Sequence, residues 1–391
     1  MYFASILTLF IGIYFLGGLT LFSCRHSTHF KYRFPILTYL MSFHLLGKGT
    51  LDVFKLTGYG GFAELNCYEL YWLNRITIMP FYVLFPFSVG LFMLVYRSHT
   101  TLQVPRLACK LFNIRTDKFV IQKLPWYVYL LAYTISIALP ILIYLIDLAS
   151  GVLENLDKTF PLNGATICTG PSNYSSVVVN GIYCVVGIVL FFKLKKYEDG
   201  LGIQKQYRIM AILYTPIFII LMILNSVFFD NSLPFSMNAF FSFLYNFFEL
   251  VCLFYLPLYF HGSYRHAINK MRMSIKYSIT EMHTLFQNPS YRRMFFIYAG
   301  RHLSSNYLLF LDKFDDLKKC KSDAVYNVKS KELFDAFISK DACFYVKIPK
   351  ELFRELKSYK IYPKAVLDGI HNHVKEYIFD NLYFPFMNDR E

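Results

Sequence analysis

The chain has 391 residues, of which 55% are hydrophobic and only 17% are charged, and its formal net charge is +14 at pH 7. A water-soluble domain usually carries about 25% charged residues, so part of this chain is expected to lie in a membrane, where charge is costly. The basic residues gather between apolar runs, and this distribution argues against a nucleic-acid-binding protein.

Apolar runs of roughly membrane-spanning length follow one another through the first two thirds of the chain. The seven runs are 3–23, 35–56, 76–96, 125–147, 175–192, 209–229 and 238–260. The hydrocarbon core of a bilayer is ~30 Å thick and needs roughly 20 apolar residues of helix. We therefore predict a seven-helix transmembrane domain over residues 1–260.

The Lys and Arg residues between the runs predict its orientation. The segments after the first, third and fifth runs carry 14 of them, whereas the alternate segments carry 3. Because basic loops stay in the cytosol, the N-terminus is expected outside and the C-terminus inside. The first run is followed, not preceded, by basic residues, as in an uncleaved anchor. We expect an integral multi-pass protein of the plasma membrane.

Two features of the expected outer loops agree with this topology. The sequon Asn173-Tyr174-Ser175 lies in the expected outer loop before the fifth run, a candidate glycosylation site although its closeness to the membrane disfavours modification. Cys67 and Cys168 fall in the two larger outer segments, where oxidation can occur, and we predict a disulfide between them. The other six cysteines lie in apolar runs or on the cytosolic side and are interpreted as reduced packing residues.

Charged residues inside the apolar runs form a candidate polar site. Lys48 and Asp52 are four residues apart and share one helix face, and Glu249 of the last run is a candidate third member. Charges in a membrane usually face the helix-bundle interior in pairs. A ligand pocket or switch and a self-satisfied structural pair are both compatible with this pattern. No metal, nucleophile or phosphate-loop motif is found, so we expect no cofactor and no intrinsic enzyme activity.

Residues 261–278, HGSYRHAINKMRMSIKYS, separate the apolar part from the tail. Four basic residues alternate with apolar ones in this segment, namely Arg265, Lys270, Arg272 and Lys276. A basic amphipathic helix along the inner leaflet is predicted, with membrane lipids as its partner. A solvated linker is the alternative.

The tail, residues 279–391, has the charge content of a soluble domain and apolar residues at helical spacing. Its two apolar bursts, Met294–Ala299 and Tyr307–Leu311, are too short to span a bilayer. We predict two core-facing helices joined at Ser304-Ser305, and further helices starting at Pro349 and Pro363. The fold class is therefore all-α in both parts of the chain.

The tail resembles a regulator-of-G-protein-signalling (RGS) domain. The stretch LFQNPSYRRMFFIYAGRHLSSNYLLFLDKFDDLKK has the family's helix with paired aromatics at Phe295–Phe296, then a polar loop, then a helix opening at Leu308–Phe310. The segments ELFDAFISKDACFYVKIPKEL and YPKAVLDGIHNHVKEYIFDNLYFPFM are similar to the family's middle and last helices. The resemblance covers about 280–388 and implies a cytosolic RGS-like domain over 279–391. With the seven predicted spans before it, the chain resembles the seven-transmembrane proteins that carry an RGS domain as their tail.

The resemblance also implies a partner and a contact surface. An RGS domain accelerates GTP hydrolysis by holding the switch segments of a Gα subunit, which itself supplies the catalytic groups. The positions implied to contact Gα are Ser305, Asn306, Tyr307, Lys347, Asn381 and Tyr383. Asn306-Tyr307 replaces the family's Glu-Asn, Lys347 replaces Asn, and Asn381 replaces Asp.

These features predict a membrane-bound regulator of heterotrimeric G-protein signalling. Its tail would bind Gα and accelerate GTP hydrolysis, and its seven spans would act as an anchor or as a receptor-like sensor of an extracellular ligand. The alternative is a receptor-like, channel or transporter protein whose degenerate tail is a scaffold without GTPase stimulation.

Overall fold

The computed structural model describes residues 2–24, 32–57, 67–101, 126–149, 159–162, 165–168, 172–227, 233–274, 279–320, 322–339, 342, 344–357, 359 and 362–388. The chain divides into two compact units. The first unit comprises residues 1–92, 126–197 and 202–260, and the second comprises 93–125, 198–201 and 261–391.

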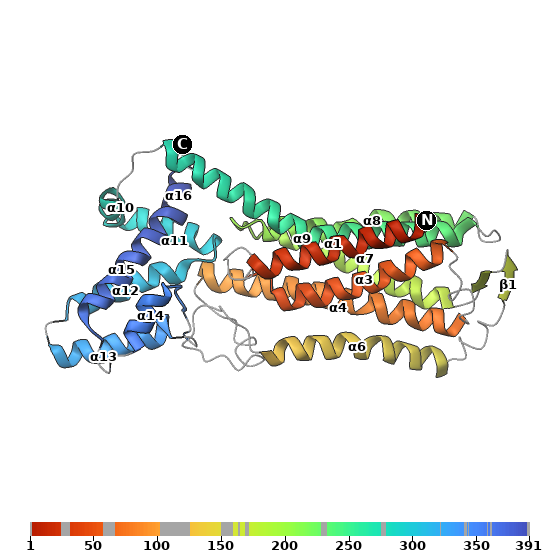
Figure 1. Ribbon diagram of the computed structural model, residues 1–391, viewed down its shortest axis with the longest axis horizontal. Coiled ribbons are helices and arrows are strands. Elements are labelled where there is room, and N and C mark those ends of the chain that lie inside the picture. Colours follow the sequence, from red (N-terminus) through yellow and green to blue (C-terminus); the bar gives the residue numbers. More distant parts are fainter. Residues whose placement is uncertain are drawn as a thin grey trace. The chain divides into compact units, whose positions relative to one another are not determined.

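Each of the seven predicted apolar runs coincides with a helix (Figure 1). These helices are α1 (Tyr2–Cys24), α3 (Pro35–Thr57), α4 (Cys67–Thr101), α6 (Trp126–Ala149), α7 (Ser172–Leu194), α8 (Ile203–Val227) and α9 (Leu233–Ser274). Within the described residues, three helical segments are long and apolar enough to cross a membrane, namely Arg75–Thr100, Trp126–Ala149 and Phe240–Ser263. The helical nature of the runs is confirmed, and a count of seven spans stays a prediction.

The first unit packs mainly through aromatic and aliphatic side chains. Phe10 of α1 is buried with Leu250 and Phe254 of α9. Tyr82 of α4 stacks on Tyr183 of α7 with 4.0 Å between ring centroids. Helix α1 lies beside α3, and α7 lies beside α8. Polar residues of α3 and α9, among them Asp52 and Glu249, are buried within the same unit.

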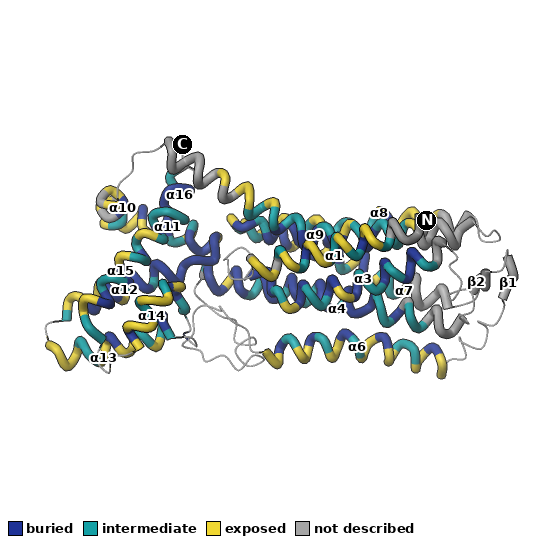
Figure 2. The backbone as a smooth tube through the Cα atoms, viewed as in Figure 1, coloured by how far each residue is buried: buried dark blue, intermediate teal, exposed yellow. Residues whose placement is uncertain are grey.

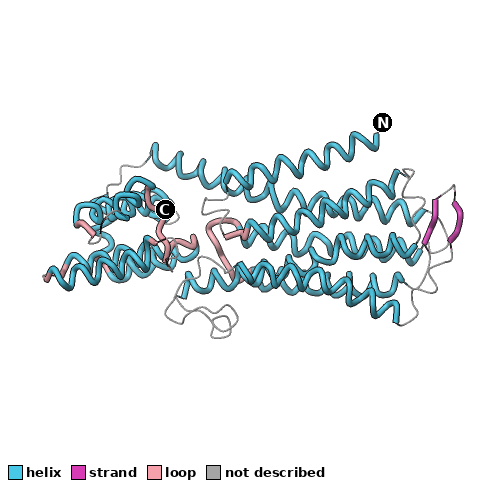
Figure 3. The backbone as a smooth tube through the Cα atoms, turned by 60° about the horizontal axis from the view of Figure 1, so that its bottom comes forward, coloured by secondary structure: helices cyan, strands magenta, loops and turns pink. Residues whose placement is uncertain are grey.

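A short hairpin was not predicted from the sequence. Strands β1 (Thr159–Leu162) and β2 (Ala165–Cys168) pair antiparallel, with Thr159 opposite Cys168 (Figure 3). Four-residue strands are too short to show a recognisable alternation of polar and apolar residues. Apart from this hairpin, the described residues form an all-α fold, as expected.

Helix α9 extends beyond the last apolar run. It continues from Leu233 to Ser274 without a break, so the first part of the basic segment 261–278 prolongs the same helix. After Pro257, no proline interrupts the sequence up to Ser274, and the backbone hydrogen-bond pattern can therefore continue. Residues 275–278 lie outside the described residues.

The C-terminal domain within the second unit is helical. Its elements are α10 (Ile279–Phe286), α11 (Pro289–Arg301), α12 (Ser305–Lys318), α13 (Asp323–Leu333), η3 (Phe334–Ile338), α14 (Lys350–Lys357), α15 (Lys364–Ile378), η4 (Phe379–Tyr383) and α16 (Phe384–Asn388). The two η elements are π-helical turns. Helices α14 and α15 begin directly after Pro349 and Pro363, as predicted.

This domain has a single apolar core. The core includes Phe295 and Ala299 from the first predicted burst and Leu308, Phe310 and Leu311 from the second. All core residues lie between Met282 and Phe386, within one continuous part of the sequence. The prediction of two core-facing helices is therefore confirmed.

Candidate functional site

The N-terminus of helix α11 is capped by an asparagine side chain. Asn288 precedes it, and its side-chain oxygen accepts hydrogen bonds from the backbone N–H groups of Ser290 and Tyr291 at 3.0 and 3.4 Å. Pro289 occupies the first helical position, where a missing N–H costs nothing. The cap fixes the start of the helix that leads to the predicted Gα-contacting turn.

Helix α11 ends in a tight left-handed turn at Leu303, whose φ is 53°. The N–H of Leu303 donates to the Gly300 carbonyl at 2.9 Å, and the N–H of Ser304 donates to the Ala299 carbonyl at 2.8 Å. This pair of bonds defines a Schellman motif, in which glycine is the usual residue at the left-handed position. Because the Leu303 side chain is 99% buried, its packing offsets the backbone strain.

The predicted Gα-contacting residues at the start of α12 are buried. Ser305, Asn306 and Tyr307 are 0%, 3% and 7% exposed. Asn306 donates from its side-chain nitrogen to the Tyr345 carbonyl at 2.7 Å. The ring of Tyr307 stacks on Tyr377 of α15 at 4.1 Å. The turn between α11 and α12 is therefore tied to the loop before α14 and to α15.

The other three predicted contact residues lie in different environments. Lys347 is exposed in the loop before α14, two residues after the carbonyl that Asn306 holds. Asn381 is partly exposed in η4 and donates to the Tyr377 carbonyl at 2.9 Å. Tyr383 is fully buried and stacks with Phe379. The structure thus brings the first loop and the middle loop together, and it places Tyr383 in the core.

Comparison with protein families identifies this region. Residues 281–390 match the family model described as "Regulator of G protein signaling domain". Residues 281–390 form an RGS domain. The match confirms the resemblance seen in the sequence and assigns this part of the chain to a GTPase-activating class of domain. A comparison of the chain with curated proteins found no match.

The first unit contains a second candidate site, a buried polar network between α3 and α9. Lys48 and Asp52 form an ion pair and are 6% and 1% exposed. The Lys48 ammonium also donates to the Ser242 hydroxyl at 2.8 Å. Asp52 further accepts hydrogen bonds from Ser242 at 2.7 Å and from Asn246 at 3.0 Å. Every partner of the Asp52 carboxylate in this network is a donor, as a buried charge requires.

Glu249 lies one turn beyond Asn246 on α9 and is fully buried. Neither carboxyl oxygen makes a hydrogen bond of ordinary geometry among the described residues, although Tyr245 is close enough to interact with it. The structure gives Glu249 no ion pair with Lys48 among the described residues, so its membership of the Lys48–Asp52 site remains a prediction.

Sequence reasoning missed the partners of this network and a second buried bridge. Ser242 completes the Lys48–Asp52 network. At the middle of α9, Gln206 accepts from the Arg33 guanidinium at 2.8 Å and donates to the Cys252 carbonyl at 3.0 Å. Polar residues spaced three or four apart on α9, at 242, 246 and 249, were a usable signal for a polar face.

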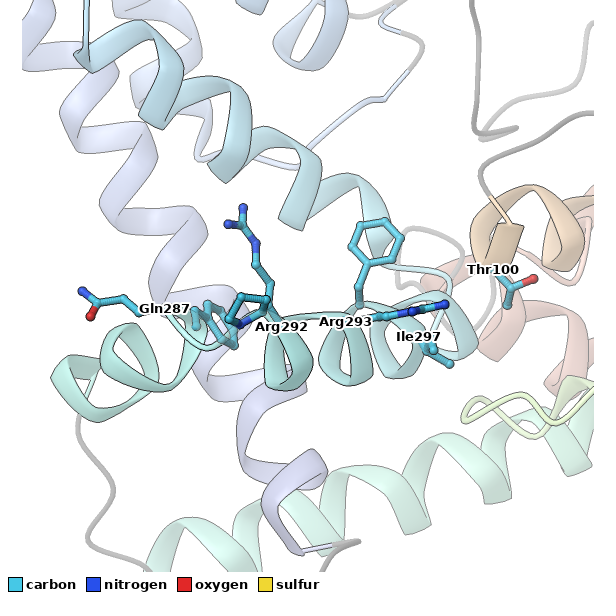
Figure 4. A pocket seen from close by; sticks show the side chains of 8 residues that line it. Thr100, Gln287, Arg292, Arg293 and Ile297 are labelled. Carbon is cyan, nitrogen blue, oxygen red and sulfur yellow. The ribbon is translucent and has the colours of Figure 1, made fainter.

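A cavity of about 580 Å³ opens beside α10 and α11 in the second unit (Figure 4). Its lining combines apolar and cationic side chains, namely Thr100, Phe286, Gln287, Pro289, Arg292, Arg293, Phe296 and Ile297. Arg292 pairs with Asp312, and the two arginine side chains point in different directions (Figure 4). The cavity therefore lacks the converging cations expected of an anion site.

Three further predicted residues belong to the disulfide and to the sequon. The side chains of Cys67, Cys168 and Asn173 lie outside the described residues. Asn173 belongs to the first turn of α7 by its backbone. Among the described residues, no group of three or more His, Cys, Asp or Glu side chains could hold a metal ion.

Proposed function

We propose that the chain is a membrane-bound regulator of heterotrimeric G-protein signalling whose RGS domain binds Gα and accelerates its GTP hydrolysis. The observation that carries this proposal is the RGS match over residues 281–390, together with an uninterrupted apolar core in that region. In this class of reaction the Gα subunit supplies the arginine, glutamine and magnesium site, so the domain needs only a rigid contact surface.

A membrane location is supported by the outward-facing side chains of the first unit. Helix α6 exposes most of its apolar residues, among them Leu130, Leu131, Ile135, Leu142 and Ile146, each more than half exposed (Figure 2). Helix α1 does the same with Leu9, Phe15, Leu16 and Leu19. Contiguous apolar surfaces of this kind are unfavourable in water and favourable against lipid. The spans would then anchor the RGS domain at the cytosolic face, where Gα subunits also reside.

The second candidate function is Gα binding without acceleration of hydrolysis. It is favoured by the geometry of Asn306, whose amide is already held by the Tyr345 carbonyl, and by the stacking of Tyr307 on Tyr377. The Asn306 amide nitrogen and the Tyr307 ring are thus engaged within the domain and are not available to position the catalytic glutamine of Gα. A domain with this loop would recruit Gα and leave its turnover unchanged.

Single-turnover GTP hydrolysis separates the two functions. The fragment 279–391 contains the whole core of the domain, and we expect it to accelerate hydrolysis by at least one member of a panel of purified Gα subunits. Binding to Gα with GDP and aluminium fluoride, measured in parallel, reports recognition of the transition-state form. Binding without acceleration would establish the second function, and the absence of both would exclude each of them.

A further inference from the structure

The turn between α11 and α12 is covered by segments from elsewhere in the second unit. Residues His302 to Leu308 are all buried, as the dark colour at the start of α12 shows (Figure 2). A connecting turn normally lies at the surface, because its backbone groups need water. The covering segments are 96–100, at the end of α4, and 198–201, and their contacts with residues 300–305 are here called the turn contact.

The first side of the turn contact is formed by His99. Its Nδ1 lies 2.9 Å from the Ser305 hydroxyl, and both residues are 0% exposed. The backbones also approach closely at Gly300. A methyl group added there would lie 2.9 Å from the His99 carbonyl oxygen and 3.2 Å from the Thr100 Cα atom. Only a glycine at this position permits the observed approach.

The second side is formed by residues 198–201. The N–H of Gly200 donates to the Arg301 carbonyl at 3.2 Å, and Glu198 lies 3.5 Å from the Arg301 guanidinium. Gly200 also faces the His302 ring, because a methyl group added to it would lie 2.1 Å from that ring. Tyr96 donates to the Glu198 carbonyl at 2.9 Å and links the two covering segments.

We propose that the turn contact is autoinhibitory: segments 96–100 and 198–201 occupy the face of the RGS domain that a Gα subunit needs, and Gα binds only after they release it. The inference rests on the proposed function, which places Ser305 at the Gα surface. Ser305 is 0% exposed while His99 lies against its hydroxyl, so a Gα residue cannot reach that hydroxyl until segment 96–100 moves away. The chain's own segments and Gα are therefore competitors for one surface, and a signal that frees the turn would increase Gα binding.

Gly300→Ala in the full-length protein tests this directly. Alanine favours the helix at this position, so the domain keeps its fold, whereas the added methyl group excludes the observed approach of His99. Gly369→Ala in α15 is the matched control, since its nearest neighbour would be Leu352 at an ordinary 3.6 Å. Gly200→Ala opens the contact from the other side and leaves the sequence of the RGS domain intact.

Two measurements are needed on the protein in lipid nanodiscs. Hydrogen exchange at the backbone amide of residue 200, corrected for the intrinsic rate of each variant, reports the contact itself, because this N–H donates to the Arg301 carbonyl. Affinity for a panel of Gα subunits with GDP and aluminium fluoride reports whether the Gα-binding surface is accessible. If the closed state dominates, we expect Gly300→Ala and Gly200→Ala to speed the exchange and to raise the affinity at least about tenfold. Gly369→Ala should change neither.

The outcomes distinguish this inference from the proposed function. Faster exchange with unchanged Gα affinity would overturn autoinhibition and leave Gα binding intact. Unchanged exchange in both variants would show that the turn contact does not exist in the protein and would also overturn it. If exchange is faster but neither the full-length variants nor the fragment 279–391 bind Gα, the proposed function is excluded and the inference with it.

Discussion

At the scale of single residues, side chains at positions where the RGS family contacts Gα make contacts inside this domain. Asn306 stands where the RGS family has a carboxylate, and here its amide nitrogen holds the Tyr345 carbonyl. An acid at this position would place an acceptor against an acceptor. Sequence alignment can identify the position, but only the structure shows that the amide's donor is the group in use.

We predict that Asn306→Asp, although it restores the acidic character of the family, destabilises the RGS domain. The half-buried Tyr345 carbonyl would lose its donor and face a carboxylate, at a cost of about 1–3 kcal/mol. Thermal unfolding of the fragment 279–391 measures this. Asn372→Asp, at an exposed position of α15, is the control and should change the midpoint little. Equal midpoints for the two variants would contradict the assigned role of Asn306.

A second prediction at this scale concerns the stability contributed by the Lys48–Asp52 network. Lys48→Met leaves the Asp52 carboxylate buried with only Ser242 and Asn246 as donors, and we expect a loss of about 3–5 kcal/mol. The double variant Lys48→Met/Asp52→Leu removes both charges, and it should recover at least half of that loss.

The measurement is the midpoint of thermal unfolding of the full-length protein in detergent. Lys205→Met, an exposed position of α8, controls for the loss of a lysine. Additive effects of the Lys48 and Asp52 substitutions would show that the two charges do not depend on each other.

At the scale of elements, helices were predictable and their contacts were not. Continuous apolar runs identify the seven helices of the first unit, and apolar residues at helical spacing identify α11, α12, α14 and α15 in the tail, because both patterns extend over many residues. The hairpin β1–β2 was missed because its strands are four residues long. The turn contact was missed for a different reason: His99, Gly200 and Ser305 are about 100 residues apart in sequence, and nothing in any one segment indicates the others.

The end of α11 also makes the second unit sensitive to pH. Burial, and to a smaller extent the charge of the neighbouring Arg301, lower the pKa of His302 from 6.5 to about 4. The unfolded state then binds a proton between pH 6.5 and 4 that the folded state does not. Stability is complete above pH 6.5 and falls with pH below it, by about 2 kcal/mol between pH 7.5 and pH 5.

Hydrogen exchange of the buried amides of α11 and α12 in the full-length protein, corrected for the intrinsic rate at each pH, measures this loss. His302→Phe keeps an aromatic ring beside Tyr298 and Gly200 and has no proton to bind. The variant should lose most of the pH dependence in this range. A wild-type profile that is flat from pH 7.5 to 5, or one that His302→Phe leaves unchanged, would contradict the prediction.

At the scale of the whole molecule, the distribution of charged residues along the sequence distinguishes the first 260 residues from the RGS domain. Charged residues are sparse through the first 260 positions, where apolar side chains face outward on α1 and α6. They are common in the RGS domain, where the apolar side chains face a single core. The family of the tail could be recognised from ordered motifs, whereas the number of spans rests on the seven runs and on the balance of Lys and Arg between them.

The predicted topology has a consequence for the cysteines. If the N-terminus is outside, then Cys67 at the start of α4 and Cys168 at the end of β2 both face an oxidising compartment, and their disulfide ties α4 to the hairpin. Cys67→Ser and Cys168→Ser should each lower the amount of protein at the cell surface. The double variant should express no worse than either single variant, because both substitutions remove the same bond.

Cys320→Ser, which removes a free thiol of the RGS domain, is the control and should have no effect. In the inverted topology both cysteines would be reduced in the cytosol, so surface levels unchanged by all three substitutions would count against the orientation as well as the disulfide.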